Sequence, residues 1–543
     1  MQKFSVCVAV VIIASFFPFS CIYGQSGYTD HNDLSVRLQD LAGEYPELAS
    51  LETLDQTDGG KEIWLLSIGE GELENRPAIA VVGGISADHP IGTELALLFA
   101  EKILKNSERE DVNELLSRSA FYVFPDMNPD ARAQFFDPLR YERTGNDYPV
   151  ESVERDSRLG EDPYTDLNGD GMITLMRIED PAGDWIPHPE DERVMVRASY
   201  EKRETGNYKV LAEGVDKDLY DLFNMHREGM VDFNRNFTFD YPAFTPRAGE
   251  HAVSETETRA IADFLFGAKN VFAVVGFGPA DNLSEPLAYN ERAASGRMVT
   301  GILEGDVPVN RLVSNKYNEI TGGENGGRIS GSEGDFFQWA YFHYGRFSFS
   351  TPGWHVPQIS SQDERGGEQL SFLRWAEEED LENVFVPWQQ VDHPDYPDRK
   401  VEVGGIAPFV MKNPPYRFVE KTAGDHYRFL LELAKMRPVI DITNVKTESL
   451  GSDLHRITAE ITNTGTFPTV TELGERVRWV QKTVVNFDPE NDQELVSGKR
   501  IEVLDRIEGK SGYECSWLVR GSGTVNIRAG AESTGFKQID INL

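Results

Sequence analysis

AIAVVGGISADHPIGTELALLFAEKIL, residues 78–104, is the stretch of this sequence that decides the fold. Its first five residues are all apolar, which is typical of a short strand buried on both faces. Gly83 and Gly84 end the strand, and the apolar spacing from Thr93 to Leu104 predicts a helix. Strand, loop and helix in this order favour an α/β sheet whose functional loops follow the strand ends.

The same alternation of strands and helices extends along most of the chain. The expected helices begin at Leu34 and span 256–266, and the expected strands lie at 63–68, 120–124 and 271–276. Because buried strands alternate with helices, we expect one α/β domain over residues 29–436.

The pattern changes near Val439. Short alternating segments such as 456–461 and 476–480 are separated by Asn-Thr-Gly and Ser-Gly turns. This pattern predicts an all-β sandwich domain over residues 439–543. Its plain role is to pack on the first domain, and binding of a carbohydrate or a protein partner is the alternative.

The composition excludes several kinds of partner. The chain carries 53 Lys and Arg against 90 Asp and Glu, a net charge of −37. We therefore expect binding neither to nucleic acid nor to an anionic membrane. The composition does not indicate an oligomeric state.

The N-terminus has the layout of a secretory signal over residues 1–24. Lys3 precedes an apolar run from Val6 to Phe19, which small and polar residues follow. The run is shorter than the about 20 residues that span a bilayer, so we expect no transmembrane anchor. The protein is then secreted, periplasmic or on the cell surface. Lipid attachment at Cys21 is the alternative to cleavage after Gly24.

Removal of this segment leaves Cys515 as the one cysteine. An intramolecular disulfide and a cysteine-based metal site are thereby excluded. Its simplest role is that of a small buried hydrophobic residue.

Several ordered segments resemble the carboxypeptidase A-like zinc metallopeptidases. These segments are residues 82–96, 124–132 with 231–237, 271–283, and 331–341 with 347–354. The resemblance covers roughly residues 30–435, and it implies a mixed sheet of the eight-stranded type flanked by helices.

The resemblance also shows which catalytic residues are substituted. Ser86 and His89 stand where the family has its first two zinc ligands, and Phe277 stands where it has the third. The general-base Glu of the family falls at Thr351 or Pro352. Catalytic zinc needs three protein ligands, and serine and phenylalanine do not serve as such. The chain therefore resembles an inactive member from which zinc is absent.

The residues that grip the substrate carboxylate in this family are kept as Asn234 and Arg235. A further family arginine corresponds to Arg132 or Arg143. A guanidinium presents a fork of donors that matches a carboxylate, so peptide or protein C-termini are the expected ligands. Pairing of Arg235 with an internal Asp is the plain alternative.

Two other functions stay open at this point. The first is an active metallocarboxypeptidase with a rearranged site, in which Asp88 and His89 bind a metal together with Glu333 or Asp335. The second is a structural or adhesive surface protein that binds neither peptide nor zinc.

A separate segment has the first half of a calcium-loop pattern. Asp166, Asn168 and Asp170 supply oxygens at positions 1, 3 and 5, and Met172 would add its carbonyl at position 7. Position 12 is Arg177 in place of the usual Glu, so Glu179 or Asp180 would have to complete the shell. An Asx-rich turn without an ion is the alternative.

Overall fold

The structure is a computed structural model that describes residues 27–142, 144–147, 165–215, 230–322, 326–358, 365–490 and 492–543. Its central sheet is built from β1 (Ala49–Gln56), β2 (Glu62–Ile68), β3 (Ala78–Val82), β4 (Ala120–Phe124), β11 (Val271–Phe277) and β12 (Phe347–Thr351). The strand order is β1-β2-β4-β3-β11-β12. The four strands β4, β3, β11 and β12 run parallel, and β1 and β2 pair antiparallel.

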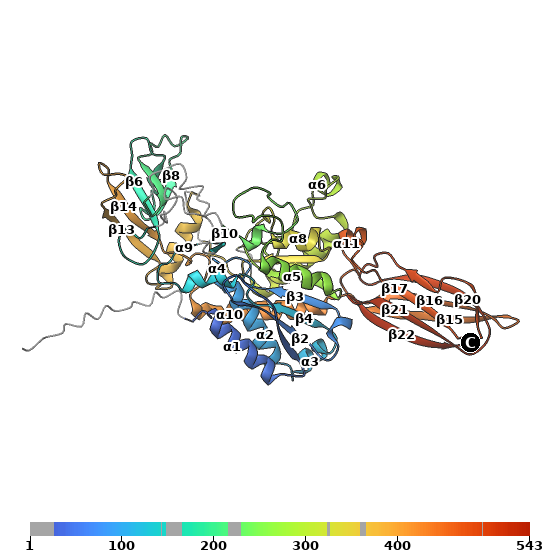
Figure 1. The fold of residues 1–543 in the computed structure, drawn as a ribbon. Coiled ribbons are helices and arrows are strands. Elements are labelled where there is room, and N and C mark those ends of the chain that lie inside the picture. The colour runs from blue at the N-terminus through green and yellow to red at the C-terminus, as the bar shows by residue number, and fades with distance from the viewer. Residues whose placement is uncertain are drawn as a thin grey trace, which may run out of the picture.

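Helices cover both faces of this sheet (Figure 1). One face carries α1 (His31–Glu44), α2 (Pro90–Lys105), α3 (Glu110–Leu116), α7 (Val307–Thr321) and α10 (Tyr416–Lys435). The other carries α5 (Thr256–Gly267) and α8 (Phe336–Phe342). Every residue of β3 and β4 is buried, as the uniformly apolar sequences predict. The expected α/β class is confirmed, with six strands in the described sheet where the resemblance implied eight.

A β lobe that the sequence did not predict stands beside the sheet (Figure 1). It consists of β6 (Leu175–Glu179), β7 (Trp185–Pro187), β8 (Met195–Arg197), β9 (Tyr208–Ala212), β13 (Phe385–Val391) and β14 (Val401–Ile406), with α9 (Gly367–Glu378) packed on it. Its strands come from two distant parts of the chain, so no local pattern marked them as one unit. Between the lobe and the sheet lie α4 (Pro129–Ala133) and the short pair β5 (Asn146–Asp147) and β10 (Met230–Val231).

The C-terminal domain is an all-β sandwich, as expected. Its strands are β15 (Ile440–Gly451), β16 (Leu454–Asn463), β17 (Val484–Pro489), β18 (Glu494–Ser497), β19 (Ile501–Val503), β20 (Ser511–Arg520), β21 (Thr524–Ala531) and β22 (Gly535–Asn542). They form two sheets, β15-β16-β20-β18 and β19-β17-β21-β22. Cys515 is buried in the core of this domain beside Trp517. The strand expected at 476–480 is wrong, because α11 (Glu472–Arg476) occupies the start of that segment.

Aromatic and charged contacts hold the sandwich to the α/β domain. The ring of Phe467 lies 4.9 Å from that of Phe347 and belongs to the core between the sheet and its helices. Arg506 and Asp306 form a buried ion pair at 2.5 Å. The two domains are therefore joined by shared core as well as by the chain. Among the described residues, no helix has the length and apolar character needed to cross a membrane.

Candidate carboxylate-binding site

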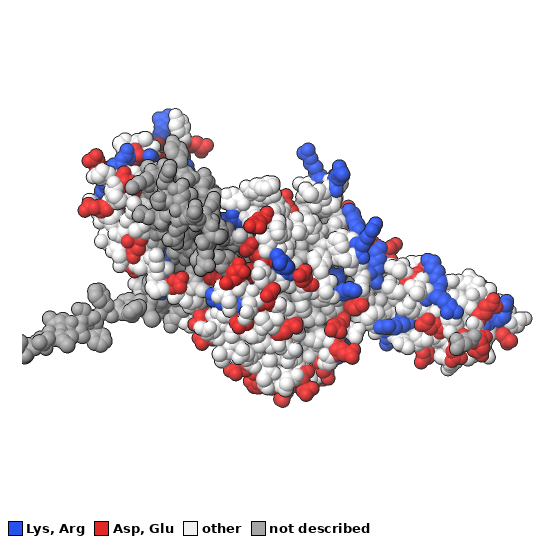
Figure 2. All heavy atoms as spheres, in the orientation of Figure 1, with Lys and Arg blue, Asp and Glu red and all other residues white. Residues whose placement is uncertain are grey.

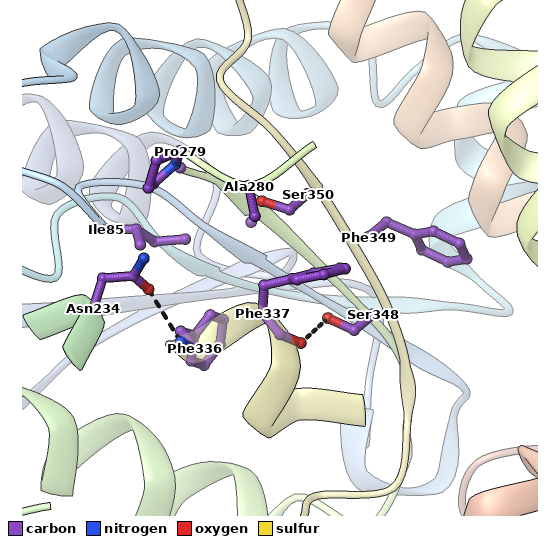
Figure 3. A pocket seen from close by; sticks show the side chains of 11 residues that line it. Ile85, Asn234, Pro279, Ala280, Phe336, Phe337, Ser348, Phe349 and Ser350 are labelled. Carbon is purple, nitrogen blue, oxygen red and sulfur yellow. Dashed lines mark hydrogen bonds between the residues drawn. The ribbon is translucent and has the colours of Figure 1, made fainter. Parts of the chain in front are cut away.

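A small pocket lies where β11 and β12 end (Figure 3). Parallel strands bring their carboxyl ends to one edge of the sheet, and the loops there carry binding residues in α/β folds. The lining residues are Ile85, Asn234, Gly276, Gly278, Pro279, Ala280, Phe336, Phe337, Ser348, Phe349 and Ser350. The pocket is small, and its free space is about that of one water molecule.

Strand alternation decides which residues face this pocket. Gly276 of β11 and Ser350 of β12 line it. Their neighbours Phe277 and Thr351 lie in the core on the opposite face of the sheet. The ring of Phe277 is 5.4 Å from that of His426 on α10. Successive side chains of a strand point to opposite faces of the sheet. A residue one position along the strand from a pocket residue therefore lies in the core.

Phe277 and Thr351, the positions predicted from the resemblance, therefore face the core. Thr351 hydrogen bonds through Oγ1 with the hydroxyl of Tyr317 at 3.1 Å, and Pro352 is buried directly after β12. The pocket-facing Gly276 and Ser350 were missed. The alternation of Phe347, Phe349 and Thr351 with two serines was the signal that could have found Ser350.

Ser86 and His89 both bond to the side chain between them. The hydroxyl of Ser86 donates to Asp88 Oδ1 at 2.5 Å, and Nδ1 of His89 lies 2.8 Å from the same oxygen. The other oxygen, Oδ2, accepts from the Lys412 ammonium at 2.5 Å. The same ammonium lies 2.6 Å from Glu142 Oε2. Lys412, from the segment before α10, was not singled out in the sequence.

The charges of this cluster stabilise one another. Burial by itself would raise the pKa of Asp88, but His89 and Lys412 hold it well below its usual range. Burial would lower the pKa of Lys412, whereas Asp88 and Glu142 raise it above the ordinary lysine value. Both groups are therefore ionised at neutral pH, and Lys412 supplies the positive charge that Asp88 requires.

These side chains do not fit a zinc ion. A zinc site needs three convergent ligands with lone pairs available, and here Asp88 already accepts from a serine and a lysine. Neither Gly276 nor Phe277 offers a donor atom from β11. Within the part of the chain that the structure describes, no three acidic, His or Cys side chains converge as metal ligands do.

Glu333 and Asp335 are the residues expected to bind a metal together with Asp88 and His89 in a rearranged site. Asp335 begins α8, and its carboxylate accepts from the backbone N–H of Ser332 at 2.5 Å and of Gln338 at 2.7 Å. Burial raises the pKa of Asp335 to about 7. Its side chain caps the helix, which is a common role of aspartate at this position.

Asn234 lies at the opposite wall of the pocket, in a short 3-10 helix (Phe233–Arg235). Its Oδ1 accepts from the backbone N–H of Phe336 at 3.0 Å, which fixes the amide at the start of α8. This bond leaves Nδ2 directed toward Ile85 (Figure 3). Two amide hydrogens are thus available to an acceptor in the pocket.

Arg235 is half-buried next to Asn234 but does not line the pocket. Its Nη2 donates to Thr245 Oγ1 at 3.3 Å, and Nε is buried without a partner among the described residues. The nearby Asp232 pairs at 2.7 Å with Arg247 instead. The expected alternative, an internal ion pair of Arg235 with an Asp, is absent from the described residues.

Arg132 and Arg143 were the two candidates for the further family arginine. Arg132 is buried and donates to Asp126 at 2.7 Å and to the carbonyl of Thr29 at 2.7 Å. It is therefore committed to the interior. Arg143 lies outside the described residues.

The loop that begins at Asp166 is closed by its own backbone. The carboxylate of Asp166 accepts from the N–H groups of Gly169 at 2.6 Å and Gly171 at 2.8 Å. Asn168 Oδ1 accepts from the N–H of Asp170, and Asp170 Oδ1 accepts from the N–H of Met172. Arg177, at position 12, pairs instead with Glu402 at 2.9 Å.

A buried carboxylate that the sequence analysis missed completes this loop. Glu213 is fully buried and accepts from the N–H of Leu167 at 2.7 Å and of Thr174 at 3.0 Å. It thus ties both ends of the loop to β9. Its distance of 39 residues from Thr174 in the sequence gave no local signal.

Comparisons with known proteins agree with the resemblance. Residues 35–165 match the zinc carboxypeptidase family, and residues 439–542 match a domain of unknown function (DUF8731). Carboxypeptidase B of Astacus astacus is 34% identical over 111 residues, or 20% of this chain and 36% of that protein. Carboxypeptidase D of Mus musculus is 37% identical over 110 residues, or 19% of this chain and 8% of that protein. The protein resembles the zinc carboxypeptidases.

The match to these curated relatives spans about a third of the first and less than a tenth of the second. Among solved structures, carboxypeptidase A from Helicoverpa armigera aligns with a TM-score of 0.42 and 12% identity. That alignment covers 75% of this chain and 73% of the insect chain. Thrombin activatable fibrinolysis inhibitor aligns over the same share of this chain, with a TM-score of 0.41 and 12% identity.

Proposed function

We propose that this zinc carboxypeptidase-like protein binds the C-termini of peptides or proteins without cleaving them. The observation that carries the proposal is the uneven use of polar groups around the pocket. Asn234 keeps its amide donors and Arg235 has one hydrogen bond among the described residues. The Ser86–His89 loop, in contrast, is saturated by Asp88 and Lys412.

The geometry gives each retained group a role. Phe336 holds the oxygen of Asn234, so the amide presents N–H groups to a carboxylate in a fixed orientation. Arg235 would add a charge-assisted bond from its guanidinium. Ile85, Phe336 and Phe337 make the pocket walls apolar, which strengthens such bonds by excluding water. Since Ser350 lacks a carboxylate to activate water, binding without hydrolysis is the expected outcome.

Calorimetry with paired peptides tests this proposal. A peptide with a free C-terminus should bind to the full-length protein, and the same peptide as a C-terminal amide should bind at least about tenfold more weakly. Arg235→Ala should remove the preference for the free acid. Arg428→Ala, a change of an exposed arginine on α10, should leave the preference unchanged.

Two results would overturn it. Stoichiometric zinc in the purified protein, with chelator-sensitive release of C-terminal residues, would make it an active metallocarboxypeptidase. Equal binding of acid and amide, or no binding of either, would leave the structural or adhesive role.

We further propose that the protein is exported, with residues 1–24 removed as a signal. These residues lie outside the described part of the chain, so the proposal rests on their sequence pattern. N-terminal sequencing of the protein from the cell envelope or medium should begin near Gln25. Recovery with an acyl group on Cys21 would favour the lipoprotein alternative.

For the loop 166–172 we propose calcium binding. The support is the set of oxygen donors on Asp166, Asn168 and Asp170 within a turn that Gly169 and Gly171 make at positive φ. Calcium prefers such carboxylate and carbonyl oxygens. Calcium should raise the melting temperature of the wild type and not that of Asp170→Ala. An equal response of both proteins, or none in either, would indicate the Asx-rich turn alone.

A further inference from the structure

Four exposed arginines mark the junction of the two domains. Arg292 lies in α6 (Glu291–Ser295), Arg297 two residues after it, Arg478 two residues after α11, and Arg500 directly before β19 of the C-terminal domain. We refer to these four as the junction arginines. Figure 2 shows Lys and Arg side chains gathered along this side, from α6 past α11 and onto the C-terminal domain.

The junction arginines are not neutralised within the protein. No carboxylate of the described residues forms an ion pair with any of the four, although paired cations lie beside them in Arg476 and Lys482. Two acids of α11 are occupied elsewhere. Glu472 accepts from the N–H of Gly305 and pairs with Arg476, and Glu475 accepts from the N–H of Arg506. Free positive charge at this place is unexpected in a chain of net charge −37.

Packing fixes the elements that carry these arginines. Ala294 of α6 and Leu473 of α11 belong to one buried apolar cluster. Below it, Asp306 is fully buried and bonds to Arg506 at 2.5 Å and to the Tyr341 hydroxyl at 2.7 Å. The positive side chains therefore stand on a rigid base that spans both domains. Binding of a ligand to several of them therefore carries no entropy cost for ordering the backbone.

The charge is also unevenly divided between the domains. Residues 439–543 carry 12 Lys and Arg against 16 Asp and Glu, so the α/β part holds most of the net negative charge. An anionic ligand would therefore meet less repulsion from the C-terminal domain than from the α/β part.

An exposed aromatic ring completes the surface. The side chain of Trp479, next to Arg478, is 47% exposed. Its Nε1 donates to the carbonyl of Tyr344, and its ring meets Phe266 edge to face at 5.8 Å, which holds the orientation of the indole. A fixed aromatic face beside cations suits a sugar ring, whose C–H groups pack on the indole while its acidic substituents meet the arginines.

We propose that the junction arginines and Trp479 bind an anionic glycan, a polysaccharide with carboxylate or sulfate groups. The glycan surface is separate from the pocket at Asn234, so the two proposals can be tested independently.

Binding of dextran sulfate to the full-length protein tests this inference. Wild-type protein should bind dextran sulfate, should not bind neutral dextran of the same size, and should bind more weakly as salt rises. The triple variant Arg297→Ala/Arg478→Ala/Arg500→Ala should lose at least about tenfold in affinity. It should keep the melting temperature, because these side chains have no ion pairs to lose among the described residues.

A matched variant distinguishes the loss of these particular arginines from the loss of three positive charges anywhere on the protein. Lys105→Ala/Arg109→Ala/Arg118→Ala removes the same number of cations from the end of α2 and from the two residues that flank α3, and these side chains are 60%, 56% and 62% exposed. It should bind dextran sulfate as the wild type does. An equal loss in both triple variants, or no binding by the wild type, would overturn the proposal. Tighter binding of duplex DNA than of dextran sulfate at the same salt would overturn the assignment to a glycan.

Discussion

The Ser86–His89 loop and the Asn234–Arg235 turn are both rich in polar groups, yet they differ in how those groups are used. In the loop, Ser86, His89 and Lys412 all bond to Asp88. In the turn, the side-chain oxygen of Asn234 accepts from the N–H of Phe336, and Arg235 donates one N–H to Thr245. A group that is already paired inside the protein must lose that bond before it can bind a ligand. The difference teaches that the polar groups of the loop are committed to one another, whereas the turn keeps donors without a partner among the described residues.

The largest effect is expected from removing Lys412, the cation that bonds to Asp88 of the loop. Lys412→Met leaves Asp88 buried without its ammonium, and losing one partner of a fully buried pair costs about 3–5 kcal/mol. Because the Lys412 side chain is 37% exposed, water can reach the site, and we expect a loss of about 2 kcal/mol in unfolding free energy. Urea denaturation measures it. Lys102→Met, which breaks a pair with the 72% exposed Glu420, should cost less than about 1 kcal/mol.

A pH titration of stability sharpens the same point. The folded state holds the pKa of Asp88 below its unfolded value of about 4, so its contribution is complete above pH 4 and is lost as pH falls below it. Asp88→Asn should therefore flatten the decline in unfolding free energy below pH 4. Each unit of pKa shift is worth about 1.4 kcal/mol. If wild type and variant decline in parallel, Asp88 is not held ionised by this cluster.

The turn can be tested by keeping its charge and removing its fork of donors. Arg235→Lys keeps a cation but loses the fork of donors, so a free-acid peptide should bind roughly tenfold more weakly, or about 1.4 kcal/mol. Fluorescence anisotropy with a labelled peptide measures the affinity. Arg374→Lys, on α9, serves as the control and should bind as the wild type does. Unchanged affinity in Arg235→Lys would show that the turn does not grip a carboxylate.

The smallest expected effect concerns the pocket floor. A Cβ on Gly276 would lie 2.8 Å from Cδ1 of Ile85, the end of a flexible side chain that can move. Gly276→Ala should cost about 1 kcal/mol of stability and narrow the pocket, which weakens peptide binding. Gly424→Ala, in α10 with no neighbour within 4 Å, should instead stabilise by about 0.5–1 kcal/mol. Thermal melts and anisotropy together separate the two outcomes.

Local patterns predicted most elements near this site but not the direction of their side chains. The expected helix at 256–266 and strand at 271–276 match α5 and β11 closely. On β11 the facing of the side chains could not be predicted, because a nearly all-apolar strand buried on both faces carries no alternation to read. The segment after Thr471 folded as α11 because Leu473 is buried at the domain junction, a contact invisible in a local window.

The sequence by itself determined the α/β class and the C-terminal β-sandwich. These follow from periodicity and residue type, which are local properties. Only the tertiary structure decided that Lys412 neutralises Asp88, that Gly276 and Ser350 face the pocket, and that Arg235 is spared by the pairing of Asp232 with Arg247. Each of these depends on which distant segments meet, and burial and charge pairing fix that only when the whole chain is folded.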